Sequence, residues 1–264
     1  MKINPIIPTR QTNQFSKSYV KKQAFMDNSD LNFKANSSSK HIKEFFEMMD
    51  FIALWKSFKD MDINKLQSLN IQNLRIIDKN LVSGATFETR PVQDLKKLKK
   101  NGIESIIDFR EEASSNFAKI CKKMNIDYFN FILDNVMNFQ NEEYFIRHDN
   151  KRIIVRDEFV KELKKFFNTV NTQKTYMGCH FGVDRTNLSV VMNYLLNPKS
   201  MNAPDIITWP GENKKTIANK NIKVVKRLVK YLDKDQKQEL DIPENYGDEL
   251  NKRIYILLLK NNLL

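Results

Sequence analysis

Apolar residues follow two periods along the chain, and these periods predict alternating strands and helices. Short apolar runs of the kind that form buried strands lie at 74–82, with a turn at 78–80, and at 105–109, 127–133 and 175–177, the last leading into Gly178 and Cys179. Spacings of three and four residues predict helices at 91–101, 113–124, 157–170, 187–196, 217–233 and 248–260. Strands that alternate with helices of this length indicate an α/β domain with a central, mostly parallel sheet flanked by helices.

The first sixty residues depart from this alternation. Residues 1–40 are rich in Asn, Ser, Gln and Lys and offer little apolar surface to offset the entropy of ordering, which predicts a disordered basic tail. From 41 to 61, apolar side chains recur at helical spacing and predict a helix that covers the core. The expected organisation is a tail at 1–40 followed by one folded domain at 41–264.

Charge and cysteine content narrow the class of protein. The 264 residues carry 44 Lys+Arg and 32 Asp+Glu, a formal net charge of +12, which indicates an anionic partner such as nucleic acid, acidic lipid or phosphate. Two cysteines, Cys121 and Cys179, cannot make a disulfide framework, so a reducing compartment is expected. No apolar run approaches the ~20 residues that span a bilayer, and the first residues show no signal-peptide pattern. We therefore expect a cytoplasmic protein. Secretion by a route that uses no cleaved signal is the alternative.

The stretch 176–187, Tyr-Met-Gly-Cys-His-Phe-Gly-Val-Asp-Arg-Thr-Asn, concentrates the candidate chemistry. Cys179 and Arg185 lie six residues apart with Gly182 between them, after an apolar strand and before a helix. A strand that turns through such a loop into a helix presents backbone N–H groups and the helix dipole to a phosphate. Arg185 can hold two phosphate oxygens, and the same loop favours the thiolate form of Cys179. The stretch predicts attack of Cys179 on phosphorus, a cysteinyl-phosphate intermediate and its hydrolysis by water.

Residues 179–186 resemble the signature loop of the protein tyrosine phosphatase superfamily, Cys-x5-Arg-(Ser/Thr). Their Asp-Arg-Thr ending is similar to that of a subset of bacterial and fungal phosphatases, some acting on phosphotyrosine proteins and some on phosphoinositides. The segments 80–85, Asn-Leu-Val-Ser-Gly-Ala, and 102–110, Gly-Ile-Glu-Ser-Ile-Ile-Asp-Phe-Arg, resemble the early part of the same family. The resemblance covers roughly residues 73–200 and leaves the helices at 41–61 and 217–260 as additions to a phosphatase core.

The resemblance implies a tyrosine-phosphatase-like fold and a cysteine-dependent phosphomonoester hydrolase of phosphotyrosine or dual specificity, with neither metal nor other cofactor. It implies that Thr186 hydrogen-bonds the sulfur and joins the catalytic residues. It also implies a phosphate-binding loop made of consecutive residues: Cys179, His180, Phe181, Gly182, Val183, Asp184 and Arg185. A phosphoinositide is the alternative substrate, and a phosphate-binding module without turnover is the alternative function.

The sequence departs from the family pattern in three places: the loop holds only one glycine between Cys179 and Arg185, and two further departures concern the chemistry. The residue before the cysteine is usually a His that tunes the thiol, and here it is Gly178, which motivates the alternative without turnover. The general acid is open, because Asp134, after the strand at 127–133, and Asp184, inside the loop, are equally good candidates. The loop candidate Asp134 precedes the signature by an unusually long segment, and a polar insertion at 135–156 would account for this. Asp149, within that insertion, is the third candidate.

Basic clusters and a few further residues complete the expectations. Lysines gather at 96–100, and the helix region 214–230 holds seven Lys or Arg and no acid, which predicts a solvated basic face or a platform for acidic lipid or substrate. No nucleic-acid reading motif is present, so nucleic acid is not an expected partner. Asp108 and Arg110 are expected to pair near the loop, and Cys121 to be a buried thiol. The expected partners are a phosphorylated protein or phosphoinositide substrate and an acidic membrane surface, and the protein is expected to be a monomer.

Overall fold

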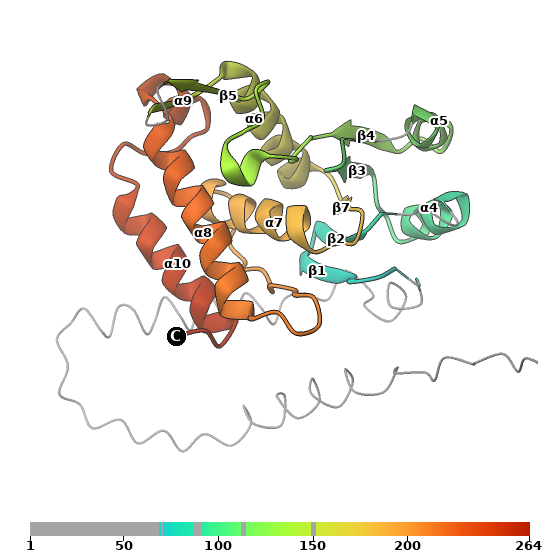
Figure 1. The fold of residues 1–264 in the computed structure, drawn as a ribbon. Coiled ribbons are helices and arrows are strands. Elements are labelled where there is room, and N and C mark those ends of the chain that lie inside the picture. The colour runs from blue at the N-terminus through green and yellow to red at the C-terminus, as the bar shows by residue number, and fades with distance from the viewer. Residues whose placement is uncertain (1–68, 70, 87–90, 112–114, 149–151) are drawn as a thin grey trace, which may run out of the picture. The chain divides into compact units, whose positions relative to one another are not determined.

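A computed structural model describes residues 69, 71–86, 91–111, 115–148 and 152–264 of the chain (Figure 1). The predicted tail at 1–40 and the predicted helix at 41–61 lie outside the described residues. The elements follow in this order: β1 (Arg75–Asp78), β2 (Leu81–Ala85), α4 (Pro91–Lys100), β3 (Ser105–Asp108), α5 (Ser115–Lys123), β4 (Asp127–Asn130), the 3-10 helix η1 (Val136–Asn138), β5 (Phe145–His148), β6 (Arg152–Val155), α6 (Asp157–Thr172), β7 (Thr175–Cys179), α7 (Asp184–Leu196), α8 (Lys214–Tyr231), α9 (Lys234–Glu239) and α10 (Gly247–Lys260).

A five-stranded sheet with the order β1-β2-β7-β3-β4 forms the centre of the domain. The pairs β2–β7, β7–β3 and β3–β4 are parallel, and only the edge pair β1–β2 is antiparallel. A tight turn joins that pair, with the Asn80 N–H donating to Asp78 at 2.8 Å. The predicted α/β class with a mostly parallel sheet is confirmed, and β7 occupies the middle position.

Helices cover both faces of this sheet, as Figure 1 shows. On one face α4 and α5 pack on a smaller core that includes Val82, Ile106 and Tyr176. On the other face α6, α7, α8 and α10 enclose the larger core. Helix α7 lies deepest, since every residue from Thr186 to Leu196 is buried. Strands covered on both faces need apolar side chains at successive positions, which explains the short apolar runs in the sequence.

Several elements differ from their predicted form: β2 extends to Ala85, the short helix α9 was not predicted, and three further differences concern β4, the insertion and α7. Strand β4 ends at Asn130, three residues early, because its side chain donates to the carbonyls of Asp108 and Arg110 where the partner strand ends. The polar insertion at 135–156 folds into η1 and the hairpin β5–β6, and both contact α8. Helix α7 begins at Asp184 rather than 187, so it includes the arginine of the signature loop. Within the described ranges, no helix has both the length and the apolar character that crossing a bilayer requires.

Candidate active site

Cys179 is the last residue of the central strand β7, and the loop that follows leads directly into α7. The strand is held on both sides up to this point: the Thr86 N–H donates to the Cys179 carbonyl and the Phe109 N–H to the Gly178 carbonyl, each at 2.9 Å. In a parallel sheet, the loops after neighbouring strands gather at the carboxyl edge, where ligands bind. The fold therefore places the signature loop between the ends of β2 and β3.

Thr186, in the first turn of α7, is bonded to Cys179 through a single hydroxyl. Its Oγ1 accepts from the Cys179 backbone N–H at 3.0 Å and donates to the Cys179 Sγ at 3.1 Å. Both residues are buried, with Cys179 3 % exposed. A hydroxyl donor aimed at sulfur stabilises the thiolate over the thiol, because only the anion is a strong acceptor.

Three glycines allow the loop to lie against strand β2. Gly182 has φ +72°, and a Cβ built on it would lie 2.4 Å from the Gly84 carbonyl carbon and 2.5 Å from the Ala85 nitrogen. A Cβ on Gly178 would lie 2.4 Å from the Gly84 carbonyl oxygen. The chain therefore has no room for a side chain before Cys179, which is the physical reason that Gly stands there. Two of the three segments that carry the family resemblance, 80–85 and 179–186, therefore meet at Gly84 and Gly182.

The loop backbone is fixed by two further bonds. Asn73 donates its side-chain amide to the Phe181 carbonyl at 2.8 Å. The Gly182 N–H donates to the Cys179 carbonyl at 3.3 Å, so this amide is engaged within the loop itself. The rings of His180 and Phe181 meet edge to face, with centroids 4.2 Å apart.

Arg185 forms an ion pair with Asp134 across the carboxyl edge of the sheet. Its Nη1 lies 2.8 Å from Asp134 Oδ2, and both side chains are 28 % exposed. The same oxygen accepts from the Glu111 N–H at 3.2 Å, which fixes the carboxylate in place. The structure thus brings the loop arginine and the first loop candidate for the general acid together, although 51 residues separate them.

The other acid candidates lie differently. Asp184 is the exposed first residue of α7, next to Arg185 in sequence. Asp149 lies outside the described residues. The intervening chain between Asp134 and β7 is taken up by η1, the β5–β6 hairpin and α6, so the insertion accounts for the long spacing.

The expected pair of Asp108 and Arg110 is present at the end of β3. Arg110 Nη2 lies 2.7 Å from Asp108 Oδ2, and its Nε donates to Oδ1 at 2.9 Å. Tyr128 also donates its hydroxyl to Asp108 at 3.1 Å. Burial raises the pKa of Tyr128, and the Asp108 charge raises it further, so this hydroxyl stays protonated. Asp108 and Arg110 thus pair at the end of β3, the strand next to β7.

Sequence reasoning missed two buried polar residues behind the loop, Arg75 and Asn187. Arg75 Nη1 donates to Asn187 Oδ1 at 3.0 Å, and Asn187 directly follows Thr186 in α7. The only signal was the alternation of β1, in which Arg75 shares the buried face with Ile77. Within the part of the chain that the structure describes, no three His, Cys, Asp or Glu side chains gather as metal ligands would.

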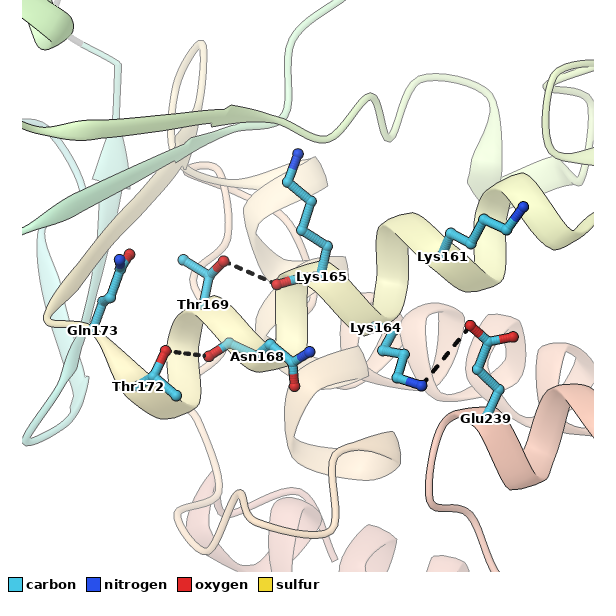
Figure 2. Close-up of a pocket in the computed structure, with 8 residues that line it drawn as sticks. All are labelled: Lys161, Lys164, Lys165, Asn168, Thr169, Thr172, Gln173 and Glu239. Carbon is cyan, nitrogen blue, oxygen red and sulfur yellow. Dashed lines mark hydrogen bonds and ion pairs between the residues drawn. The ribbon is translucent and has the colours of Figure 1, made fainter.

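A shallow depression of about 350 Å³ on α6 lies apart from these residues (Figure 2). Lys161, Lys164 and Lys165 line it together with polar side chains, and Lys164 pairs with Glu239 at 4.0 Å. None of the signature-loop residues is among its lining, and it is a solvated helix surface.

Comparison with known proteins gives a fold-level likeness. No protein-family profile and no curated protein matches the chain. A DUF442 protein from Shewanella putrefaciens CN-32, named as a phosphatase, is 15 % identical with a TM-score of 0.39, over 63 % of this chain and 98 % of that one. The core catalytic domain of the PP-IP phosphatase SIW14 from S. cerevisiae is 15 % identical with a TM-score of 0.35, over 74 % and 95 %.

TpbA from P. aeruginosa, whose structure is also known in complex with pTyr, is 12 % identical with a TM-score of 0.34, over 70 % of this chain and 91 % of TpbA.

Proposed function

We propose that this protein is a cysteine-dependent phosphatase that hydrolyses phosphomonoesters, with phosphotyrosine as its substrate. One observation carries the proposal: a single Thr186 hydroxyl is bonded to both the backbone and the sulfur of Cys179, one residue from an arginine that holds a carboxylate. A guanidinium that binds a carboxylate through Nη1 can bind phosphate oxygens in the same way. Cys179, Thr186 and Arg185 also lie where a strand ends and a helix begins, a position that favours a bound phosphate.

The reaction proceeds in two displacements at phosphorus. In the first, the Cys179 thiolate forms an S–P bond while the ester P–O bond breaks, and the leaving oxygen takes a proton from the general acid. In the second, water forms a P–O bond as the S–P bond breaks, and its proton returns to the same carboxylate. The Thr186 hydroxyl stabilises the departing thiolate, and inorganic phosphate leaves.

We assign the general acid to Asp134 rather than Asp184. Asp134 already contacts Arg185, and a phosphate that binds this arginine competes for Nη1 and places the Asp134 carboxyl beside the ester. Asp184 remains the second candidate because its side chain is exposed at the first residue of α7.

Hydrolysis rates of variants at Asp134 and Asp184 distinguish the two candidates for the general acid. Loss of the true acid slows phenyl phosphate hydrolysis far more than p-nitrophenyl phosphate hydrolysis, since only the poor leaving group needs the proton. We expect this pattern for Asp134→Asn and not for Asp184→Asn. The reverse pattern would transfer the role to Asp184.

Aromatic side chains beside the loop support an aryl phosphate. Phe181 is 44 % exposed and its ring meets that of Trp209 edge to face at 5.1 Å. Between Cys179 and Arg185 the loop carries no Lys or Arg. A substrate with several phosphates would need further cations, whereas an aromatic ring gains from packing against aromatic side chains.

The exposed lysines of helix α8 favour the alternative substrate, a phosphoinositide lipid. Helix α8 exposes a row of lysines at helical spacing and contains no acid. The row consists of Lys215, Lys220, Lys223, Lys226 and Lys230. Such a row attracts anionic headgroups by about 1 kcal/mol per charge near the membrane surface. A phosphoinositide phosphatase would use it to hold the site at a membrane.

Hydrolysis assays on the full chain test the proposal. We expect release of phosphate from a phosphotyrosine peptide, little from a phosphoserine peptide, and none from any substrate after Cys179→Ser. Cys121→Ser is the matched control and should retain activity. Faster turnover of a phosphoinositide would select the lipid substrate. Tight phosphopeptide binding without hydrolysis by the unmodified protein would select the binding module, and hydrolysis by Cys179→Ser would overturn the mechanism.

A further inference from the structure

Arg75 is a buried cation directly behind the signature loop. It is 9 % exposed, and it lies on strand β1 opposite Ser83 of β2. Its Nε donates to the Ser83 hydroxyl at 2.8 Å, and its Nη1 donates to Asn187 Oδ1 at 3.0 Å and to the Asp205 carbonyl at 2.8 Å. The guanidinium therefore joins four segments of chain: β1, β2, the first turn of α7 and the segment before α8.

Asn187 extends this network. Its Oδ1 also accepts from the Ile207 N–H, and its amide donates to the Ile207 carbonyl. Every polar atom of the Asn187 side chain is thereby bonded, and its rotation is fixed. Because Asn187 follows Thr186, the bond from Arg75 fixes the turn that presents the Thr186 hydroxyl to Cys179.

The charge of Arg75 is not neutralised by an ion pair within the described part of the chain. Its contact with Asp205 is through the backbone carbonyl, and the Asp205 carboxylate lies 3.8 Å from Lys260. Its Nη2 is buried and has no partner among the described residues. Burying a charge is costly unless nearby groups compensate it, so the negative groups that act on Arg75 are part of what holds it there.

Cys179 is one of the groups whose negative charge Arg75 experiences. Burial lowers the pKa of Arg75 to about 10, and the charges of Asp205, Cys179 and Tyr176 raise it in part. Arg75 therefore stays protonated at neutral pH. Burial raises the pKa of Tyr176 well above 10, so that hydroxyl is neutral there. An interaction between two charges is mutual, so a cation stabilised by the thiolate stabilises the thiolate equally.

Three other titratable side chains belong to the loop and the first turn of α7. They are Arg185, which is paired with Asp134, the exposed Asp184, and His180. Among them the Arg185 charge is already shared with a carboxylate and is taken up by phosphate in the proposed reaction. Arg75 is therefore a second cation near the loop, and it is held by different partners.

We propose that Arg75 is a positioning residue of the site, whose buried guanidinium favours the thiolate of Cys179 and, through Asn187, fixes the turn that carries Thr186. The proposal rests on the proposed function in so far as the thiolate is the nucleophile. Its test, however, measures the thiol directly.

The experiment is the rate of Cys179 alkylation by iodoacetamide against pH, read on the Cys179 peptide by mass spectrometry, in the otherwise unmodified full chain. We expect Arg75→Gln and Arg75→Met to raise the midpoint by about one pH unit, about a tenfold loss of thiolate below the midpoint. Arg75→Lys should keep most of the wild-type midpoint, because it keeps the charge. Arg75→Met introduces no polar group that would have to be buried, so it serves as the second neutral variant if Arg75→Gln does not fold.

Arg253→Gln is the matched control. Arg253 is equally buried and donates to the carbonyls of Tyr194, Asn197 and Ser200 near the far end of α7. A purely structural loss should therefore lower the unfolding temperature in both variants and move the midpoint in neither. An unchanged midpoint in folded Arg75→Gln or Arg75→Met would overturn the proposal. Failure of both neutral variants to fold would assign Arg75 to stability alone and overturn it as well.

The outcome is distinguishable from failure of the proposed function. A shifted midpoint in a protein that hydrolyses no phosphate would support the role of Arg75 and refute the phosphatase. Hydrolysis by the unmodified protein with an unshifted midpoint would do the opposite.

Discussion

The close approach of the signature loop to strand β2 predicts a large effect for Gly182→Ala. The substitution adds a Cβ 2.4 Å from the Gly84 carbonyl carbon, where ordinary contacts are 3.4 Å or more, so the loop must move by about 1 Å. It also places a side chain at φ +72°. The left-handed conformation costs about 1–2 kcal/mol, and a forced contact in a packed region about 1–3 kcal/mol. The free energy of unfolding should fall by about 2–5 kcal/mol.

A second glycine isolates the steric part. Gly211 has φ +86° and no atom within 4 Å of a built Cβ. Gly211→Ala should therefore lose only the conformational term, about 1–2 kcal/mol. Urea unfolding followed by tryptophan fluorescence gives both values, and the difference between the two variants measures the contact with Gly84.

The same substitution should affect catalysis. A displacement of about 1 Å in a catalytic loop can lower the rate about 100-fold. We expect this loss of kcat/KM on an aryl phosphate in folded Gly182→Ala and no loss in Gly211→Ala. Equal stability of the two variants, together with full activity of Gly182→Ala, would refute the packing of the loop against Gly84.

Three further results are expected. Thr186→Val should lower kcat about tenfold with little change in KM, since the hydroxyl bonded to sulfur is worth about 1–2 kcal/mol. Thr186→Ser keeps the hydroxyl and should retain most of the wild-type kcat. A normal kcat in Thr186→Val would exclude that hydrogen bond from catalysis. Burial, with a smaller contribution from Asp108, raises the pKa of Cys121 to about 12, so iodoacetamide at pH 8 should modify Cys179 and spare Cys121 until the protein is unfolded, as peptide mass spectrometry would show. Burial also raises the pKa of Asp78 in the folded state, so the folded protein binds more protons there than the unfolded chain, and stability falls as pH rises from about 4 through that pKa. Asp78→Asn should remove this loss and unfold at a higher temperature than the wild type at pH 7, and a lower unfolding temperature at pH 7 would contradict the assignment.

The elements that follow from the sequence are those whose pattern is imposed by local burial. β3 and β7 appear as short apolar runs because they are buried on both faces, whereas α6 and the C-terminal helices α8 and α10 show a helical period because each buries one face. The hairpin β5–β6 gave no such signal. Its strands lie outside the central sheet and pack against α8, which is distant in sequence, so their burial is not set by a local pattern.

The site residues also differ in whether contiguous sequence or distant contacts bring them together. Cys179, Arg185 and Thr186 lie on one continuous strand–loop–helix, so their spacing alone predicts that they meet. The partner of Arg185 is different, because 51 residues separate it from Asp134 and only the order of the strands brings them together. From the sequence, Asp134 and Asp184 were equal candidates for this reason.

The amino-acid sequence by itself determined the fold class, the segment that holds the candidate nucleophile and the likeness to phosphatases, since each of these is encoded in contiguous residues. Only the tertiary structure decided which distant groups surround that segment. It placed Gly84 against Gly178 and Gly182, and it brought Arg75 to Asn187 across 112 residues. Close packing and buried hydrogen bonds join positions through space, and a single sequence records them only as a small residue or a charge at an unexpected place.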